Sequence, residues 1–175
     1  IRYNTLVNGF DTSVIVAHDR GGAKFAGGNF TRVFGDRVEM HGEFAYREGA
    51  AVLLGGKYTT ASGVTTIAEF YAPPNTAYYR PATMPASAGR QHYGFARVGK
   101  ERLRELPGWK QWNVAVSLVA NLDDHSRVAV FDTGRRFGNH FYAYVHAQAP
   151  SGKWHSEYGM IPYSALVSVG VSFRL

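Results

Sequence analysis

The stretch RVEMHGEFAYRE, residues 37–48, decides the fold class of this chain. Apolar and polar residues alternate along it, and successive side chains of a β-strand point to opposite faces of the sheet. A two-residue period therefore predicts a strand with one apolar and one polar face. The apolar face would hold Val38, Met40, Gly42, Phe44 and Tyr46. The polar face would hold Arg37, Glu39, His41, Glu43 and Arg47.

Several other segments show the same two-residue period. The clearest are VTTIAEFY (64–71), WKQWNVAVSLVANL (109–122) and NHFYAYVHAQ (139–148). Turn signals such as Asn8-Gly9 and Gly35-Asp36 separate such segments, which is typical of hairpins. We therefore expect an all-β, antiparallel fold with about eleven strands of about 8–12 residues each.

Two segments lack the alternation and are expected to be long loops, at 73–90 and 149–163. The first contains four of the seven prolines of the chain, and proline interrupts regular structure. A third irregular segment, 100–108, has the pattern of a short amphipathic helical turn closed by Pro107-Gly108.

The composition narrows the classes of function. The 175 residues include 20 Gly, 11 Tyr, 11 Phe and no Cys, so a disulfide framework, a thiol nucleophile and a c-type haem attachment are excluded. The formal net charge is +6, but the basic residues are spread singly, which weighs against a nucleic-acid partner. An anionic lipid and an anionic solute both remain open as the reason for the charge. No apolar stretch is long enough for a membrane helix, whereas a membrane barrel needs none.

A membrane β-barrel and a soluble β-sandwich both contain alternating strands. Sandwich strands average about five or six residues, whereas membrane-barrel strands need about 9–11 residues to cross lipid. The apolar faces here mix small and large residues, such as Gly42 beside Phe44, and lipid tolerates such a face better than a packed core does. The sequence therefore favours a transmembrane antiparallel β-barrel, with a soluble secreted sandwich as the alternative.

The order of the turns predicts an orientation in the membrane. If the final strand ends in the periplasm, both long loops fall outside and most tight glycine turns fall inside, as in outer-membrane barrels. The same count starts the chain outside and makes the strand number odd, whereas single-chain bacterial barrels have even numbers. Residues 1–175 are thus expected to form one β-barrel domain or the C-terminal part of a larger, even-stranded barrel.

The end of the chain, VSVGVSFRL (167–175), places apolar residues at alternate positions. It resembles the C-terminal strand of bacterial outer-membrane proteins, which the barrel-assembly machinery recognises. The resemblance makes an assembly signal of Val167, Val169, Val171, Phe173 and Leu175. The commonest residue at the last position of that pattern is Phe, and here it is Leu175.

Longer stretches resemble an uncharacterised family of larger proteobacterial outer-membrane barrels. They are FTRVFGDRVEMHGEFAYREG (30–49), LLGGKYTTASGVTTIAEFYA (53–72), VSLVANLDDHSRVAV (116–130) and SEYGMIPYSALVSVGVSFRL (156–175). The resemblance implies a porin-like fold in the bacterial outer membrane and no particular substrate.

The function expected from these patterns is a porin-like channel or scaffold that passes small or hydrophobic solutes. One alternative is a barrel sheath around a partner such as an electron-transfer cytochrome, and another is a lipid-modifying enzyme of the outer membrane. We expect no enzymatic activity, no cofactor and no bound metal. The expected partners are outer-membrane lipid and lipopolysaccharide, the barrel-assembly machinery and a lumen-filling protein.

The polar faces of the predicted strands supply the candidate pore-lining residues. A wall of mixed charges could set ion preference, or it could serve only to stabilise the barrel. The candidates are Arg37, Glu39, His41, Glu43, Arg47, Glu69, His140, Tyr142, Tyr144 and His146. His140 and His146 are too far apart along one strand to share a metal by themselves.

Two further segments carry chemically active side chains. The loop KWHSEYG contains His155, Ser156 and Glu157, but a Ser–His pair is normally assembled across a fold rather than from sequence neighbours. Asp123-Asp124 could bind Ca²⁺ at a loop, and a plain β-turn explains the same pair.

Overall fold

The computed structural model describes residues 1–18, 24–47, 49–73, 92–103, 111–138 and 140–173. These residues form eleven β-strands in a single sheet. The strands are β1 (Arg2–Val7), β2 (Phe10–His18), β3 (Lys24–Phe34), β4 (Val38–Tyr46), β5 (Ala50–Thr59), β6 (Val64–Ala72), β7 (Tyr93–Glu101), β8 (Trp112–Asn121), β9 (Arg127–Phe137), β10 (Phe141–Ser151) and β11 (Leu166–Phe173).

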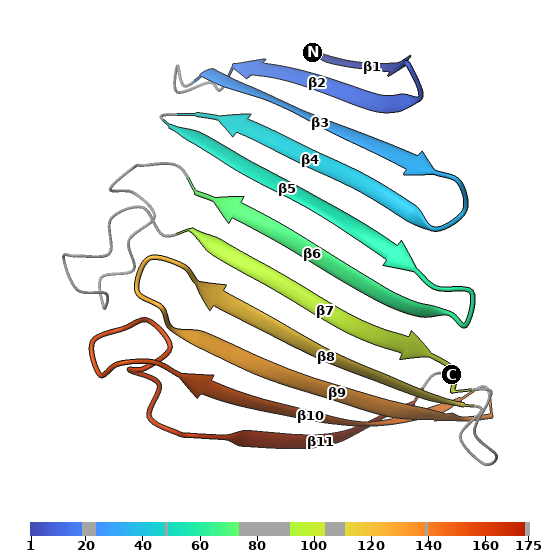
Figure 1. Ribbon diagram of the computed structural model, residues 1–175, viewed down its shortest axis with the longest axis vertical. Helices are drawn as coiled ribbons and strands as arrows, with labels where there is room; N and C mark the ends of the chain where they lie inside the picture. The colour runs from blue at the N-terminus through green and yellow to red at the C-terminus, as the bar shows by residue number, and fades with distance from the viewer. Residues whose placement is uncertain (19–23, 48, 74–91, 104–110, 139, 174–175) are drawn as a thin grey trace.

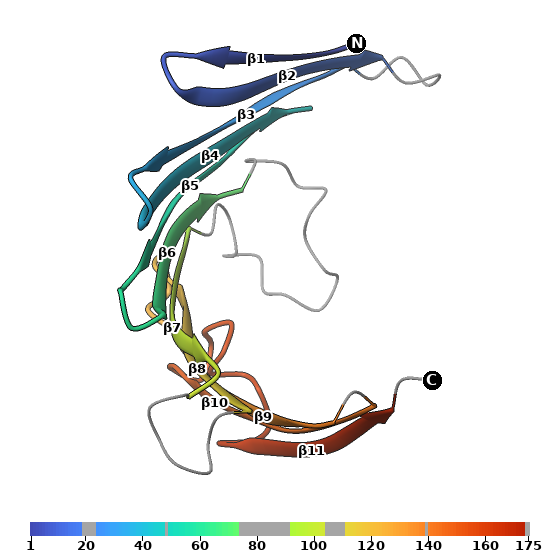
Figure 2. The same cartoon turned by 90° about the vertical axis from the view of Figure 1, so that its right-hand side faces the viewer.

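The sheet is a meander in which every strand pairs antiparallel with the next one along the chain (Figure 1). This confirms the all-β, antiparallel fold and the count of about eleven strands. The sheet is open, with β1 and β11 as its two edges. It bends strongly across the strands, so that Figure 2 shows a trough rather than a flat layer. The structure supports a barrel-like curvature, and a closed barrel is not seen.

Four tight turns lie at one end of the strands, and the loop 152–165 lies at the other end together with the β8–β9 turn (Figure 1). The turns after β1, β3, β5 and β9 lie at one end, which we call the short-turn end. Each of these turns contains a glycine with positive φ, a conformation that glycine adopts without strain. The four are Gly9, Gly35, Gly63 and Gly138. The described loop 152–165 lies at the opposite end, which we call the loop end.

Three predicted irregular segments compare differently with the structure. Most of the predicted loop 73–90 and most of the predicted helical turn 100–108 lie outside the described residues. The predicted loop 149–163 begins later, because β10 continues to Ser151. Pro150 is tolerated there since it lies opposite Val128 of β9, while the pairing with β11 already ends at Gln148. Proline has no backbone N–H, and at this position no ladder to β11 requires one.

The register gives the sheet two chemically distinct faces. Directly paired residues point to the same side, so one face can be followed across all strands. We call apolar face the side that carries Val38, Met40, Gly42, Phe44 and Tyr46 of β4. On the other strands this face includes Val14, Phe30, Leu54, Phe70, Val98, Val116, Phe131, Val145 and Val169. The opposite side, which we call the polar face, holds Glu39, His41 and Glu43.

Exposure differs sharply between the two faces. On the apolar face, Val116 is 53% exposed and Val169 is 75% exposed. On the polar face, the neighbours of Val116 are Ala115 and Ser117, and each is only 6% exposed. Among the described residues, Ala115 is the only buried hydrophobic side chain. The described sheet therefore has no hydrophobic core of its own, and no second sheet of the described chain covers the apolar face as a sandwich would require.

The polar face is the inner side of the trough. The loop 152–165 lies on the inner side in Figure 2, and its Glu157 accepts hydrogen bonds from Tyr93 and Asn121 on the polar face. Side chains converge on the inner side of a curved sheet, which explains the lower exposure there. In the described part of the chain, no helix is long and apolar enough to span a membrane.

Candidate functional site

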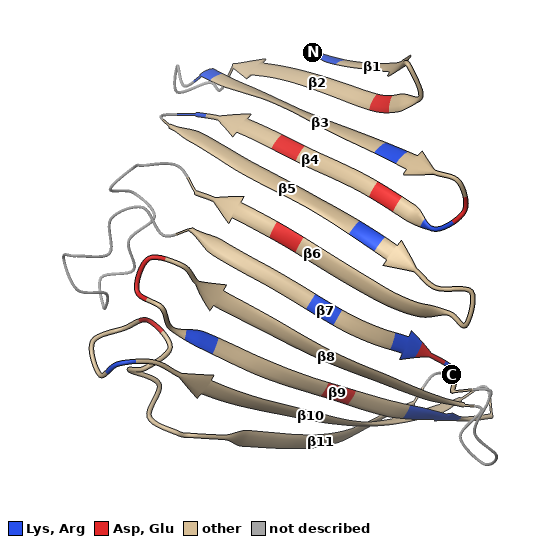
Figure 3. Cartoon of the chain, viewed as in Figure 1, with Lys and Arg blue, Asp and Glu red and all other residues tan. Residues whose placement is uncertain are grey.

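Figure 3 marks the acidic residues of the strands in red. The pairing register places all those of the described strands on the polar face. They are Asp11, Glu39, Glu43, Glu69, Glu101 and Asp132. Basic residues of the strands on the same face are Arg2, Lys57, Arg97 and Arg136. This separation follows directly from the two-residue period of the sequence. It makes the inner surface of the trough the candidate functional site.

A four-residue charge cluster spans β4, β5 and β6. His41 Nε2 lies 3.2 Å from Glu69 Oε1, and its Nδ1 lies 3.9 Å from Glu39 Oε1. Lys57 Nζ lies 3.5 Å from the second oxygen of Glu39. The cluster therefore links two carboxylates through one imidazole and holds a lysine at its end. We call these four residues the β4–β6 cluster.

Gly55 makes the β4–β6 cluster possible. It lies between His41 and Glu69 in the register of β4, β5 and β6. A Cβ atom on Gly55 would meet His41 Nε2 and would lie 2.8 Å from Cγ of Glu69. The absence of a side chain lets the imidazole cross a whole strand to reach its partner.

On the other half of the sheet, another side chain also passes over a glycine of the neighbouring strand. Tyr142 of β10 passes over Gly134 of β9, and its hydroxyl accepts a 3.0 Å hydrogen bond from Asn113 Nδ2 of β8. Next to it, His146 Nδ1 lies 2.8 Å from Asp132 Oδ1. A side chain that crosses a glycine to the second strand is therefore a repeated way of tying three strands together on the polar face.

The structure places seven of the ten predicted pore-lining residues within strands on the polar face. These seven are Glu39, His41, Glu43, Glu69, Tyr142, Tyr144 and His146. The remaining three, Arg37, Arg47 and His140, lie in the connections next to the strand ends. The seven form two separate groups, since β10 lies four strands from β6 in the sheet. In the described residues, no group of three or more His, Asp or Glu could hold a metal ion.

Sequence reasoning missed Lys57, Arg97 and Asp132. Lys57 precedes Tyr58, which lies on the apolar face. The alternation of residues in GGKYTT (55–60) could therefore have placed Lys57 on the polar face. Arg97 lies in β7, where the alternation of YGFARVGKE is weak. Asp132 lies in β9, where both faces carry apolar residues. Val128 and Val130 lie on the polar face, and Ala129 and Phe131 lie on the apolar face, so the sequence does not alternate between apolar and polar residues there.

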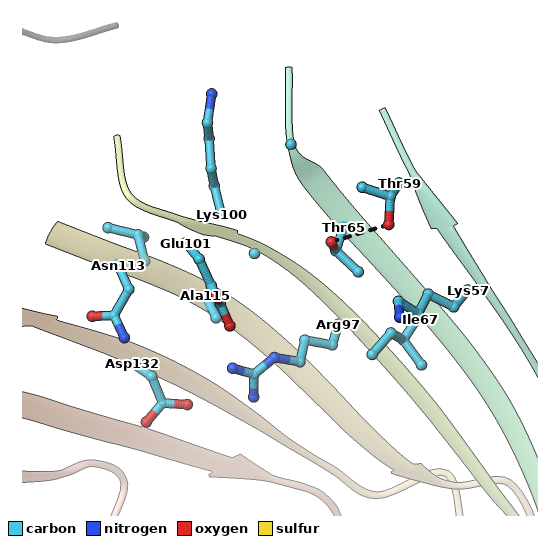
Figure 4. A pocket seen from close by; sticks show the side chains of 13 residues that line it. Lys57, Thr59, Thr65, Ile67, Arg97, Lys100, Glu101, Asn113, Ala115 and Asp132 are labelled. Carbon is cyan, nitrogen blue, oxygen red and sulfur yellow. Dashed lines mark hydrogen bonds between the residues drawn. The ribbon is translucent and has the colours of Figure 1, made fainter. Parts of the chain in front are cut away.

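A hollow opens on the polar face where small side chains meet (Figure 4). Gly99 and Ala115 pair across β7 and β8, and both line a space of about 480 Å³. Arg97 and Asp132 line this space together with Lys57. Within the described residues, Arg97 lines this space and has no hydrogen bond or ion pair.

The loop 152–165 is fastened to the polar face by Glu157. One oxygen of its carboxylate accepts 2.9 Å hydrogen bonds from the Tyr93 hydroxyl and from Asn121 Nδ2. Its backbone N–H donates a 2.7 Å bond to Asp124 Oδ2 in the β8–β9 turn. Asn121 is only 1% exposed. A buried amide must find partners, and the loop supplies one.

The carboxylate of Asp124 also organises the β8–β9 turn. Asp124 also accepts a 2.8 Å bond from the backbone N–H of Ser126. Burial raises the pKa of Asp124, but the hydrogen bonds from Glu157 and Ser126 outweigh burial and hold that pKa below its usual range. Burial, with help from the nearby carboxylates of Glu157 and Asp124, raises the pKa of Tyr158 to about 12. The phenol therefore stays neutral at ordinary pH while the carboxylate of Asp124 stays ionised.

The loop residues considered for catalysis have structural contacts. The Ser156 hydroxyl donates a 2.6 Å hydrogen bond to the backbone oxygen of Lys153 and accepts one from Gly159 N–H. His155 contacts the ring of Trp154, and Glu157 makes the contacts to Tyr93 and Asn121. The Ser156 hydroxyl thus closes a turn of its own loop. Asp123 accepts hydrogen bonds from His92 and fastens the start of β7 to the β8–β9 turn.

We expect Asp124→Asn to release the loop 152–165 from the sheet. The variant replaces a charged acceptor of two backbone N–H groups with a weaker one, at a cost of about 1–2 kcal/mol in local opening free energy. Hydrogen–deuterium exchange of residues 153–160 measures this opening. Asp123→Asn is the matched control, because it loosens His92 and should leave the exchange of the loop unchanged.

The fastening of the loop should also depend on pH. Because folding lowers the pKa of Asp124, its stabilisation is complete above the ordinary aspartate value of about 3.9 and is lost as the pH falls below it. Loop exchange, corrected for its intrinsic rate, should therefore stay constant from pH 7 to about 4.5 and rise below that. Asp124→Asn should show no such rise, and an equal rise in both proteins would contradict the role of Asp124.

Comparison of the chain with protein-family models, with curated proteins and with solved structures finds no match. The chemistry of the two faces of the sheet is therefore the basis for a functional proposal.

Proposed function

We propose that this chain forms the wall of a bacterial outer-membrane β-barrel that works as a porin-like channel. The single observation that carries the proposal is the exposed apolar face across all eleven strands. Water is a poor solvent for such a face, since burial of apolar area is worth about 25 cal/mol per Å². Lipid covers it without a partner of complementary shape, and the polar face then lines the lumen.

The strand lengths support this proposal. Strands β2 to β10 contain between 9 and 11 residues. A tilted strand needs about 9–11 residues to cross the apolar part of a bilayer. Strands of a soluble sheet average about five or six residues. The proposed spans therefore match a membrane better than a sandwich.

The two ends of the strands support an orientation. Outer-membrane barrels have short turns on the periplasmic side and longer loops outside. We therefore assign the short-turn end to the periplasm and the loop end to the cell exterior, facing lipopolysaccharide. Expected partners are the lipids of this membrane and the barrel-assembly machinery, and the proposal includes no enzymatic activity.

The last strand fits the proposed role as an assembly signal. Val167, Val169, Val171 and Phe173 of β11 all lie on the apolar face, and all are more than half exposed, at 64%, 75%, 69% and 55%. The fifth predicted residue of this signal, Leu175, lies outside the described residues. Deletion of β11 should abolish membrane insertion by purified assembly machinery in proteoliposomes.

Planar-bilayer recording of the full-length protein tests the channel directly. Arg97 lines the hollow on the polar face without an ion pair among the described residues, so its charge should attract anions. We expect Arg97→Glu to shift the anion-to-cation permeability ratio towards cations by about threefold or more, since one charge reversal in a narrow lumen is worth about 1 kcal/mol.

Two results would change the proposal. Arg97→Lys keeps the charge and should keep the permeability ratio, so an equal shift in both variants would exclude a charge effect. A protein that folds into the bilayer without conductance would contradict an open channel. That outcome would favour a barrel that encloses a partner protein.

A further inference from the structure

Figure 3 marks the charged residues along the strands. By the pairing register, the apolar face carries charges only near the ends of its strands. All of them are basic: Lys24, Arg32, Lys100, Arg127 and Arg135. In the described strands this face contains no acidic residue. Three of the five, Arg32, Lys100 and Arg135, lie towards the short-turn end. Of these three, Arg32 and Arg135 have similar surroundings, because each guanidinium lies against two aromatic rings.

Arg32 is held between two aromatic rings. Its guanidinium carbon lies 4.8 Å from the ring centre of Phe10 and 4.7 Å from that of Phe34. Phe10 begins β2 and Phe34 ends β3, so both rings stand at the short-turn end. Such distances are typical of cation–π contacts. The two rings fix the guanidinium near the rim of the apolar face.

Arg135 repeats this arrangement six strands further along the sheet. Its guanidinium carbon lies 5.9 Å from the ring centre of Trp112 and 4.8 Å from that of Phe137. Trp112 begins β8 and lies directly opposite Arg135, and Phe137 ends β9. The Nε atom of Arg135 is buried and has no hydrogen-bond partner. A buried donor without a partner is costly, so the described residues leave the polar groups of Arg135 only partly satisfied.

Each of these two sites has the same construction. An arginine stands two residues before the end of a strand, with an aromatic residue at that strand end and another at the start of the preceding strand. We call them the Arg32 clamp and the Arg135 clamp. Within the described residues, neither guanidinium has a carboxylate at ion-pair distance. Both clamps occupy one rim of the apolar face, since β3 and β9 end at the same side of the sheet (Figure 1).

We propose that the Arg32 and Arg135 clamps bind the phosphate group of an anionic glycerophospholipid at the short-turn rim of the membrane. A guanidinium binds phosphate oxygens through two parallel N–H donors. Aromatic side chains favour the boundary between headgroups and acyl chains. The apolar face beside each clamp would receive the acyl chains of the same lipid. This inference rests on the proposed function, because it requires that the apolar face lies in lipid.

A lipid is favoured over a soluble anion by the position of the clamps. Both stand beside exposed apolar side chains, where a small hydrated anion would gain no contact beyond the guanidinium. An acidic protein partner would have to cover the same apolar rim twice, at sites six strands apart. A layer of lipid reaches both sites at once.

Trp112 supplies a spectroscopic probe of the Arg135 clamp. The Trp109→Phe/Trp154→Phe variant of the full-length protein leaves Trp112 as the only tryptophan among the three of the chain. Its fluorescence is measured in phosphatidylcholine vesicles that contain one-fifth phosphatidylglycerol, with bromine on the acyl chains of one lipid or the other. We expect brominated phosphatidylglycerol to quench about fivefold more per molecule than brominated phosphatidylcholine.

The neighbouring arginines give a matched pair of variants. Arg135→Gln should reduce the quenching ratio of the two lipids to about one. Arg136→Gln removes the same charge from the polar face and should keep the ratio. Persistence of the ratio in Arg135→Gln, or its loss in Arg136→Gln, would overturn the inference. Inorganic phosphate added to the protein in detergent should leave the fluorescence of Trp112 unchanged, and a change would assign the clamp to free anions instead.

Two readouts separate the inference from the proposed function. Quenching by both brominated lipids without preference would overturn the phosphate site and leave the membrane face intact. Absence of quenching by either lipid would overturn the membrane face itself. Native mass spectrometry of the unaltered protein from mixed vesicles needs no variant and should find phosphatidylglycerol retained over phosphatidylcholine. Equal retention would contradict both clamps.

Discussion

Leu54→Arg is expected to destabilise the protein in a phospholipid bilayer by about 2–4 kcal/mol. Leu54 lies near the middle of β5 on the apolar face and is 49% exposed. In the proposed orientation its side chain lies in the acyl chains. A guanidinium there must give up its hydration or distort the lipid around it. The free energy of unfolding from vesicles, measured by urea titration, gives the size of the effect.

Leu53 is the matched control for this prediction. It is the same residue type one position earlier, and it faces the polar side directly opposite Glu43. Leu53→Arg should cost less than about 1 kcal/mol, because the new charge meets water and a carboxylate. Equal losses in the two variants would contradict a lipid-covered apolar face. In a soluble protein, Leu53→Arg should cost more stability than Leu54→Arg, since an exposed leucine tolerates a charge better than a half-buried one.

The two faces of the sheet were predictable because they depend only on the period of the sequence. In β4 every second residue is apolar, so the faces can be assigned from Val38 and Glu39 onward without any knowledge of pairing. The tight turns were predictable for a similar local reason, since Gly9 and Gly35 supply the positive φ that their turns require. The strand order was predictable as well, because a hairpin pairs each strand with the next one along the chain.

The contacts between distant residues were not predictable from the same period. His41 meets Glu69 only because the registers of β4, β5 and β6 align Gly55 between them. Glu157 meets Tyr93, 64 residues away, because a loop folds back over the sheet. Neither contact leaves a local pattern in the sequence. The rim clamps were hidden for another reason, since Arg32 and Arg135 break the alternation and look like errors in it.

Gly55→Ala is expected to disrupt the β4–β6 cluster and to cost about 1–3 kcal/mol of stability. The new methyl group would occupy the place of His41 Nε2 and press on Glu69 Cγ. The imidazole must then turn away, and the 3.2 Å contact with Glu69 is lost. Both groups are half-buried, with side-chain exposures of 21% and 29%, so water replaces only part of the lost interaction.

Gly56→Ala is the control that the chain offers. At this adjacent glycine, which points to the apolar face, a Cβ atom would meet only the backbone oxygen of Glu39 at 3.4 Å. Restricting the unfolded chain by replacing glycine stabilises a protein by about 0.4–1 kcal/mol where the new residue fits. We therefore expect the two alanine variants to change the unfolding free energy in opposite directions.

The pair of glycine variants also distinguishes a structural cluster from one that acts on permeating ions. If the β4–β6 cluster lines the lumen, Gly55→Ala should release Glu69 from His41 and shift the permeability ratio towards cations, whereas Gly56→Ala should leave that ratio unchanged. Loss of stability without a change in the ratio would assign the cluster to strand cohesion alone. No loss of stability in Gly55→Ala would mean that His41 does not cross β5, which would contradict the arrangement of the polar face.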